Sequence, residues 1–466
     1  MKRRQLNYIK EWVNRSTRKP LIIRGARQVG KTTLVRLACK EMGLELVELN
    51  MEDPQEFPPL LPQNDPQKVF QAIALSRQLH DIDPDKQLFF FDEAQACPAL
   101  IPFLRYCFER APEYRVILTG SLLEFVLAAD NYSFPVGRVE FLYLGPMTFE
   151  EYLSGTNNEN AVEQLQQVSV AKPFNEAVHN IFLKQLRDYL IIGGMPEAIN
   201  AYRETRSYVE VERAKQSIIT TYQADFHKYG RKADIDLLNR VITVIPSQLG
   251  QKVVYTRLSE GTRSTEVKRV LELLELAKVI QRCFHSHGDG LPLAAQQKPN
   301  HFKLLFLDVG LIQSMLGISL AVVETTQEIN EIAKGALAEQ FVGQHLMYER
   351  PMFEAPSIHY WERQVKHSTA EVDYLVPWDQ RVLPVEVKSG HKGHMKSLQR
   401  FLLEKKADRA LRFSSGPLLL KEYANKDMAY RFLNVPHYLI GQWQRLAEAF
   451  HTDRADAPEP AISRPG

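Results

Sequence analysis

Short apolar runs separated by helical patterns fill the first third of the chain. Residues 21–23, 88–91 and 116–118 lack polar alternation, as strands covered on both faces of a sheet do. Residues 44–49 alternate apolar and charged side chains, so this fourth strand is expected nearer a sheet edge. Because helical segments lie between the runs, the pattern predicts an α/β fold with a parallel sheet.

The pattern becomes helical and charged from about residue 155 to residue 232. Its main interruption, at residues 191–196, separates two helices and contains Gly193 and Gly194. These glycines are expected either to let two helices pack closely or to act as a hinge. The stretch therefore predicts a helical region that follows the parallel sheet.

A compact unit is predicted from about residue 233 to residue 293. A helix over 237–245 and a short one at 256–258 precede a third helix that Ser264 is expected to cap. The turn-rich residues 285–290 then form a tip between two strands. Three helices followed by a hairpin is the plan of a winged helix.

A last unit is predicted over residues 329–450. It begins with a helix over 335–348, which is followed by strands around Tyr360, over 372–376 and over 383–387. Further helices come after these strands. Helices mixed with strands in this order predict a second α/β domain.

Length and composition agree with several folded domains. The chain has 466 residues, of which 44% are hydrophobic and 24% charged, so wholesale disorder is excluded. Its length suggests about three folding units. Residues 451–466 are rich in Ala, Pro and charge, and this tail is expected to be disordered.

Charge and cysteine content limit the cellular setting. The 58 basic and 56 acidic residues nearly balance, which excludes a histone-like mode of action but not a local basic surface. The four cysteines are widely spaced without a C-x-x-C pair, which argues against a disulfide framework or a zinc ribbon. We see neither a targeting segment nor an apolar run of membrane-spanning length. A cytoplasmic protein without a membrane partner is expected.

Residues 25–32 match the pattern G-x-x-x-x-G-K-[ST] between an apolar strand and a helical segment, as the motif requires. Glycines let the backbone wrap phosphates with its amide hydrogens inward, and the next helix adds its positive end. Lys31 is expected to reach the β- and γ-phosphates of ATP, and Thr32 to ligate Mg²⁺. The residues expected to bind ATP here are Gly25, Ala26, Arg27, Gln28, Val29, Gly30, Lys31, Thr32 and Thr33.

Polar residues end two further strands of the predicted sheet. The apolar run 88–91 ends in Asp92 and Glu93. Asp92 is expected to hold the Mg²⁺ shell, and Glu93 to orient or deprotonate the attacking water. The run 116–118 ends near Thr119 and Ser121, whose side chains are placed to sense the γ-phosphate. The chain therefore predicts a nucleotide-hydrolysing site.

Several segments resemble the AAA-type ATPases of bacteria and archaea that carry a C-terminal domain of unknown function. The resemblance covers residues 21 to about 402 and implies four modules. These are an ATPase core (1–153), a helical lid (154–232), a winged helix with its connector (233–328) and a nuclease-like domain (329–450). The matching segments are residues 24–32, 92–95, 118–121, 136–138, 144–152, 193–197 and 304–311.

By this resemblance, Arg138 in the segment Val136-Gly137-Arg138 is a candidate arginine finger. Such a residue places positive charge on the γ-phosphate during transfer. It acts either within one chain or on a neighbouring copy. The alternative is a structural ion pair.

A second set of charged residues lies in the last unit. Glu386 and Lys388 are two positions apart on one strand and therefore share a face. The strand before it carries Asp373, and pairing through the connection 377–382 brings Asp373 beside Glu386. Glu339 lies on the preceding helix, at the border of its apolar stripe.

This set resembles the PD-(D/E)XK nucleases, which have a restriction-endonuclease-like fold. In this chain, Val372 stands where the motif has a proline. In that superfamily carboxylates hold Mg²⁺ against the scissile phosphate, and the lysine activates water or stabilises charge. The resemblance implies a Mg²⁺ or Mn²⁺ site formed by Glu339, Asp373 and Glu386, with catalysis by Asp373, Glu386 and Lys388. The alternative is a degenerate fold that only binds.

Basic side chains gather in two more places. Residues 1–19 carry seven basic groups and one acid, which fits nucleic-acid contact or an amphipathic helix docked on the ATPase. In the winged-helix region, basic residues either face phosphates or lie on a module that transmits motion. They are Arg257, Arg263, Lys268 and Arg269.

Two functions therefore compete. The first is an ATPase that drives domain motion coupled to a nuclease-like module that handles DNA or RNA. The second is a non-catalytic, nucleotide-gated regulator that grips DNA or a protein partner.

Overall fold

The computed structural model describes residues 1–53, 65–79, 82–128, 134–317, 335–365, 370–390, 395–424 and 428–451. The chain forms two compact units. Unit 1 comprises Met1–Glu159, Arg187–Phe284 and Pro299–Ile358. Unit 2 comprises Asn160–Leu186, His285–Lys298 and His359–Gly466. The predicted tail beyond residue 451 lies outside the described residues.

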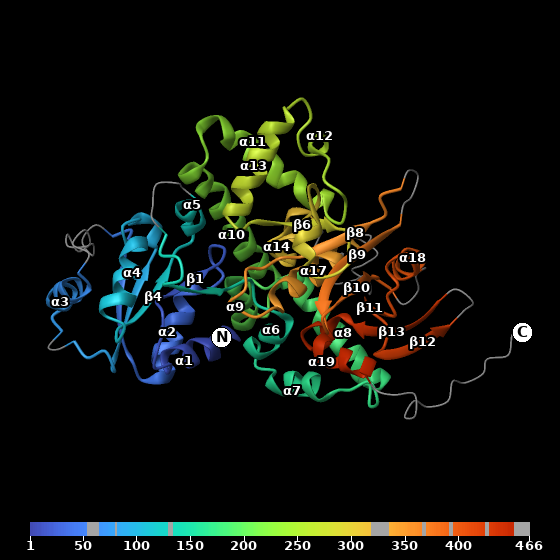
Figure 1. Cartoon of the computed structure of the whole chain (residues 1–466), viewed down its shortest axis with the longest axis horizontal. Coiled ribbons are helices and arrows are strands. Elements are labelled where there is room, and N and C mark those ends of the chain that lie inside the picture. The colour runs from blue at the N-terminus through green and yellow to red at the C-terminus, as the bar shows by residue number, and fades with distance from the viewer. Residues whose placement is uncertain are drawn as a thin grey trace, which may run out of the picture. The chain divides into compact units, whose positions relative to one another are not determined.

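A five-stranded parallel sheet forms the first half of unit 1 (Figure 1). Its strand order is β2 (Glu45–Asn50), β3 (Gln87–Asp92), β4 (Arg115–Thr119), β1 (Leu21–Arg24) and β5 (Glu140–Tyr143). The four predicted strands and the edge position of β2 are confirmed. Sequence reasoning missed β5, a short strand at the other edge whose residues are mostly half-buried.

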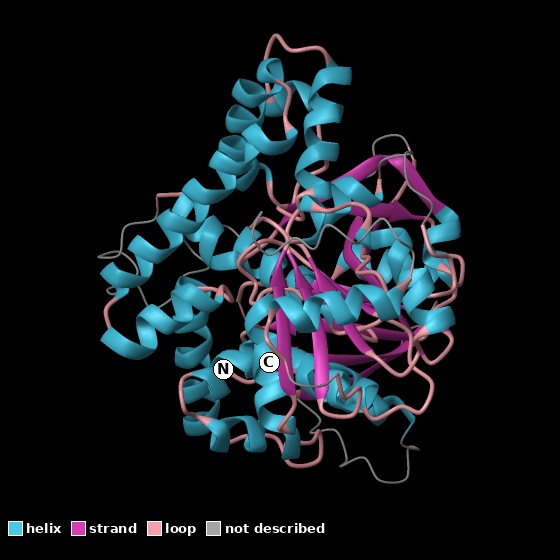
Figure 2. Ribbon diagram, turned by 90° about the vertical axis from the view of Figure 1, so that its left-hand side faces the viewer, coloured by secondary structure: helices cyan, strands magenta, loops and turns pink. Residues whose placement is uncertain are grey.

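Helices, cyan in Figure 2, connect and cover these strands. The helix α2 (Lys31–Met42) follows β1, and α1 (Gln5–Val13) packs against it with Leu6, Ile9 and Trp12 buried. The expectation that the basic N-terminus forms a docked helix is confirmed.

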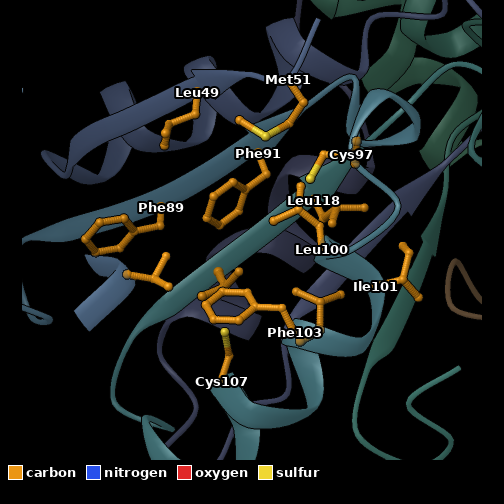
Figure 3. Close-up of a cluster of buried hydrophobic side chains, with 14 of the residues drawn as sticks. Leu49, Met51, Phe89, Phe91, Cys97, Leu100, Ile101, Phe103, Cys107 and Leu118 are labelled. Atoms are coloured by element: carbon orange, nitrogen blue, oxygen red, sulfur yellow. The ribbon is translucent and has the colours of Figure 1, made fainter. Parts of the chain in front are cut away.

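The sheet packs its apolar face against α3 (Pro66–Ser76) and α4 (Leu100–Arg110). Figure 3 shows Phe89, Phe91 and Leu118 from the strands meeting Phe103 and Cys107 of α4. Each such side chain contributes about 1.5–3 kcal/mol by leaving water. This rigid core fixes the carboxyl ends of β1, β3 and β4, where the candidate site lies.

Helices dominate the stretch after the sheet, as predicted. They are α6 (Phe149–Gly155), α7 (Glu159–Gln167), α8 (Glu176–Ile192), α9 (Pro196–Thr205) and α10 (Tyr208–Tyr229). The predicted interruption lies between α8 and α9. Gly193 has a φ of 81°, a left-handed conformation that glycine adopts readily.

Three helices and a hairpin then follow. The helices are α11 (Lys232–Val244), α12 (Tyr255–Leu258) and α13 (Ser264–Leu276), and the strands are β6 (Ile280–Ser286) and β7 (Gln297–Phe306). Lys252, before α12, forms an isolated antiparallel bridge with Lys303 of β7. Ser264 is not a cap as expected, because it is already helical and the capping position is Arg263.

The second sheet has the strand order β12-β13-β11-β10-β9-β8-β6-β7. Its remaining strands are β8 (His359–Glu362), β9 (Glu371–Trp378), β10 (Arg381–Val387), β11 (Arg409–Ser414), β12 (Leu419–Ala424) and β13 (Ala429–Pro436). The helix α18 (Lys396–Lys405) covers β9 to β11, and its Phe401 packs against Trp361.

The predicted β9–β10 hairpin is confirmed, with Tyr374 opposite Val385. Its turn is shorter than the expected connection 377–382. Only Asp379 and Gln380 lie between the strands, and both are left-handed, with φ of 47° and 58°. Such a two-residue turn matches the twist of the strands, so pairing continues to its edge.

Candidate nucleotide site

The loop between β1 and α2 forms a cradle of backbone groups. Gln28 and Gly30 have positive φ values of 61° and 95°, which turns successive amides toward one side. Gly25 lies against the β5–α6 connection, where a Cβ would come within 2.1 Å of the Leu144 carbonyl oxygen. The loop therefore needs glycine at position 25 for close packing and at position 30 for conformation.

Lys31, at the start of α2, is buried beneath this loop. Its Nζ donates to the carbonyl oxygens of Gly25 at 3.1 Å and Ala26 at 2.8 Å. Burial lowers the pKa of Lys31 to about 8, although Glu93 and Asp92 oppose this shift. A buried ammonium that loop carbonyls hold, near the carboxylates of Glu93 and Asp92, fits a phosphate-binding role.

Asp92 joins the loop to two neighbouring strands. The Thr32 hydroxyl donates to its Oδ2 at 2.6 Å, while the Glu93 amide donates to Oδ1 at 2.9 Å. Thr119 also donates to Oδ1, because β4 lies between β1 and β3 and ends at the same edge. A hydroxyl beside a carboxylate is the donor set that fits phosphate-bound Mg²⁺.

Glu93 is held in a left-handed conformation, with φ of 50°. Its Oε2 accepts from Gln95 Nε2 at 2.7 Å and from the Ser121 hydroxyl at 3.1 Å. Burial raises its pKa, but these hydrogen bonds and the charge of Lys31 outweigh burial and leave the pKa lowered. Ser121 holds this carboxylate, and its expected role as a γ-phosphate sensor stays a prediction.

Arg138 and the phosphate-binding loop lie at opposite ends of the parallel strands. β5 runs parallel to β1 with Glu140 beside Leu21, so Arg138 precedes the amino end of β5, whereas the loop follows the carboxyl end of β1. Its Nε lies 3.0 Å from Glu109 Oε1. The expected arginine-finger role within one chain is therefore wrong, because a sheet strand separates Arg138 from the loop. A role on a neighbouring copy stays a prediction.

Two ion pairs that sequence reasoning missed connect the loop region to later helices. Arg27 donates to both carboxylate oxygens of Asp225 in α10, at 2.9 and 2.6 Å, and its carbonyl accepts from the Tyr222 hydroxyl at 2.6 Å. Arg24, at the end of β1, pairs with Glu124 of α5 (Leu123–Leu127). The partners are about 100 and 200 positions away, so no local pattern announces them.

Glu124 also reaches the region after α13. Lys278 Nζ lies 3.7 Å from Glu124 Oε2, and Lys278 occupies the turn between α13 and β6. Burial raises the pKa of Glu124, but the hydrogen bond from Arg24 and the charge of Lys278 leave it lowered. The carboxylate is therefore ionised and links β1 to the turn between α13 and β6.

In unit 2 the structure brings together three residues of the second set. Asp373 Oδ2 accepts from the Val387 amide at 2.7 Å, and Lys388 forms an ion pair with Glu386. Arg412 of β11 lies beside Glu386 in the parallel register. Glu386 is almost fully buried, so these cations offset its charge in place of water.

Glu339 is on α17 (Ala336–Tyr348) in unit 1, 3.9 Å from Lys303 Nζ. The other three residues are in unit 2. Within the described ranges, no group of three or more His, Cys, Asp or Glu side chains is arranged to hold a metal ion. Within unit 2 the geometry thus brings Asp373, Glu386 and Lys388 together, and a metal-binding role for Glu339 stays a prediction.

Comparison with family models finds three matches. Residues 17–153 match an AAA domain, residues 183–321 match a domain of unknown function (DUF8612), and residues 334–438 match another domain of unknown function (DUF4143). No curated protein matches the chain. The first match and the loop geometry identify an AAA-type ATPase domain with a P-loop NTPase fold.

Solved structures of low sequence identity are also similar. The Aeropyrum pernix ORC2 protein is 13% identical over 69% of this chain and 94% of its own, with a TM-score of 0.36. The Thermotoga maritima RuvB Holliday junction branch migration motor is 16% identical over 60% and 87%, with a TM-score of 0.28. Scores of this size establish no common overall fold. Among the described helices, none has the length and apolar character to cross a membrane.

Proposed function

We propose that this chain is an ATP-hydrolysing AAA-type ATPase that uses nucleotide turnover to move its later modules. The observation that carries the proposal is the Thr32–Asp92 hydrogen bond of 2.6 Å, formed beside Lys31 and Glu93 at one edge of the sheet. Two segments about 60 residues apart in the sequence are not expected to meet in this way in a chance glycine-rich turn.

The geometry supports the following roles. The loop amides and Lys31 bind the phosphates, and Thr32 with Asp92 holds Mg²⁺, which offsets their charge. Glu93 is ionised, so it orients the attacking water and accepts a proton from it. Thr119 fixes Asp92, and Ser121 with Gln95 fixes Glu93.

Steady-state ATP hydrolysis by the purified protein tests this proposal. Lys31→Ala should abolish ATP binding, and Glu93→Gln should keep binding but lower turnover by about 10² to 10⁴, the usual contribution of a general base. Lys40→Ala, on the exposed face of α2, is the control and should retain full activity. Unchanged turnover in both site variants would reject the assignment.

The proposed lid (154–232) and winged helix (233–328) would receive the nucleotide signal through two contacts. Arg27–Asp225 leads to α10, and Glu124–Lys278 leads to the turn after α13. The order of three helices, a bridge at Lys252 and a hairpin supports a winged helix. Its Arg269 pairs with buried Asp234, which leaves fewer basic groups for phosphate contact than expected.

We also propose that residues 329–450 form a nuclease-like module that handles DNA or RNA. Lys388 beside Glu386, with Asp373 on the paired strand, supports it. Nicking of plasmid DNA and labelled RNA in Mg²⁺ or Mn²⁺ is the test. Activity that disappears in Asp373→Ala and Lys388→Ala supports cleavage at this site, whereas activity that survives both changes assigns cleavage elsewhere.

The rival function, a nucleotide-gated binding regulator, is favoured by two observations. The described residues gather no cluster of three metal-ligating side chains, and Asp373 already accepts a backbone amide. This rival predicts ATP-sensitive binding of nucleic acid or protein without cleavage in either metal. It also predicts that Asp373→Ala leaves binding unchanged.

A further inference from the structure

Arg3 reaches the phosphate-binding loop from outside the matched AAA domain, which begins at residue 17. Its Nη1 donates to the carbonyl oxygen of Val29 at 2.9 Å, and its Nη2 donates to the carbonyl oxygen of Gly145 at 2.7 Å. The side chain is 6% exposed. A guanidinium this deeply buried is costly unless its charge and its N–H groups are all satisfied.

Glu151 supplies the compensating charge. Its Oε2 lies 3.1 Å from Arg3 Nε, and its own side chain is 6% exposed. Glu151 also forms the capping box of α6 with Thr148 and accepts the Arg4 amide at 2.8 Å. The carboxylate is thus fixed by an element of the AAA domain, and it fixes the guanidinium in turn.

Val29 is the loop residue whose orientation matters most for this contact. It lies between Gln28 and Gly30, the two residues with positive φ, and its side chain is fully buried. For the loop amides to point at phosphates, the carbonyls must point away from them. Arg3 stabilises this outward orientation, because it donates a hydrogen bond to the Val29 carbonyl oxygen.

Lys31 holds the other end of the loop only until a nucleotide binds. Its Nζ donates to the Gly25 and Ala26 carbonyl oxygens, and these hydrogen bonds must break before Nζ can reach the phosphates. The Arg3 contact has no such competing role, because its two terminal nitrogens donate to the Val29 and Gly145 carbonyls and its Nε lies in ion-pair range of Glu151. Arg3 therefore keeps the loop ordered both before and after binding.

We propose that Arg3 is a positioning residue that presets the phosphate-binding loop and so sets nucleotide affinity. The inference rests on the proposed ATP binding. Arg3 touches no phosphate, so its loss raises the cost of ordering the loop on binding and leaves the bound geometry unchanged. The affinities for ATP and for ADP should fall by the same factor, because both nucleotides use the loop amides.

Isothermal calorimetry on the full chain tests the proposal with Arg3→Lys. Lysine keeps the charge beside Glu151 but has no fork to reach two carbonyls at once. We expect the Kd for ATP and for ADP to rise about tenfold, with kcat at saturating ATP changed less than twofold. The matched control is Arg4→Lys, since Arg4 bonds Glu349 and the Tyr348 carbonyl.

Melting temperature separates positioning from general stability. If Arg3→Lys and Arg4→Lys lower the melting temperature equally but only the first weakens nucleotide binding, Arg3 positions the loop. Equal nucleotide affinities in the two variants and the unmodified protein would overturn the inference. Absence of ATP binding in the unmodified protein would instead overturn the proposed function.

A double variant covers the case in which Arg3→Lys fails to fold. Arg3→Met with Glu151→Gln removes both buried charges together, so no unpaired charge is left. It should show the same tenfold loss of ATP and ADP affinity. Hydrogen exchange of residues 25–32 without nucleotide should be faster in this variant than in the unmodified protein, and unchanged exchange would contradict the inference.

Discussion

Asp308 shows how one buried side chain joins segments that are distant in sequence. Its Oδ2 accepts from the Gly194 amide at 2.7 Å, and its Oδ1 accepts from the amides of Gly310 and Leu311. A Cβ at Gly193 would come within 2.1 Å of Oδ1. The two glycines therefore permit close packing, the simpler of the two roles expected for them.

Replacing Asp308 by alanine should be strongly destabilising. Three buried amides lose their acceptor, and each such loss costs about 1–3 kcal/mol, so the free energy of unfolding should fall by at least about 3 kcal/mol. Urea denaturation followed by fluorescence measures it. Asp289→Ala, an exposed carboxylate paired with Lys405, should change it by less than about 0.5 kcal/mol. Similar values for both variants would contradict the role of Asp308.

At the same scale, the sequence predicts site residues only where chemistry and chain order coincide. Lys31, Thr32 and Asp92 meet because each follows a strand of one parallel sheet, whose carboxyl ends share an edge. The pairing of Asp225 with Arg27 has no such signal in the sequence. Asp225 lies within a helix, and helical periodicity indicates which face is buried but not which distant residue it meets. Arg138 could not be placed from the sequence, because a short motif does not reveal at which end of its strand it lies.

The helices α6 and α17 meet through a titratable contact in unit 1. His345 of α17 accepts the Phe149 amide of α6 at its Nε2, 3.0 Å away, and donates from Nδ1 to the Phe341 carbonyl. This arrangement requires a neutral imidazole. Burial lowers the pKa of His345 to about 4, and nearby Arg4 adds to this effect.

Stability should therefore fall in acid. The unfolded state takes up a proton near pH 6.5, whereas folded His345 resists until about pH 4, so its contribution is complete above 6.5 and is lost between these values. From pH 6.5 to 5, His345 alone should account for about 2 kcal/mol. Urea midpoints across this range should depend less on pH in His345→Leu than in the unmodified protein. The exposed control His227→Leu should leave the slope unchanged.

Element positions were predictable where periodicity is strong, but their membership of a packed unit was not. The helix expected over 335–348 exists as α17, and the β9–β10 hairpin forms as expected. Yet α17 packs in unit 1, where Gln340 bonds the Phe306 backbone, and the hairpin packs in unit 2. A single helix pattern cannot specify its neighbour, so the sequence alone does not place Glu339 beside Lys303.

For the whole molecule, the proposed coupling has a thermodynamic consequence. Arg27–Asp225 and Glu124–Lys278 connect the end of β1 and the nucleotide loop to the proposed lid and winged helix, so both regions contact residues next to the proposed phosphate site. If ATP changes the affinity for nucleic acid, nucleic acid must change the affinity for ATP by the same factor. Coupling free energies of about 1–3 kcal/mol correspond to factors of about 5 to 150.

We expect at least a fivefold change in the Kd of a short DNA duplex between ATP-bound Glu93→Gln and the nucleotide-free protein. The same factor should appear in the Kd for ATP measured with and without duplex, by fluorescence anisotropy and calorimetry respectively. Asp225→Asn should reduce the factor, because it weakens the Arg27 contact with α10 without touching the phosphates. Lys31→Ala should bind duplex identically with and without ATP. Equal duplex affinity in both states of Glu93→Gln would mean that the modules act independently, since no nucleotide-dependent free energy would then reach the nucleic-acid-binding surface.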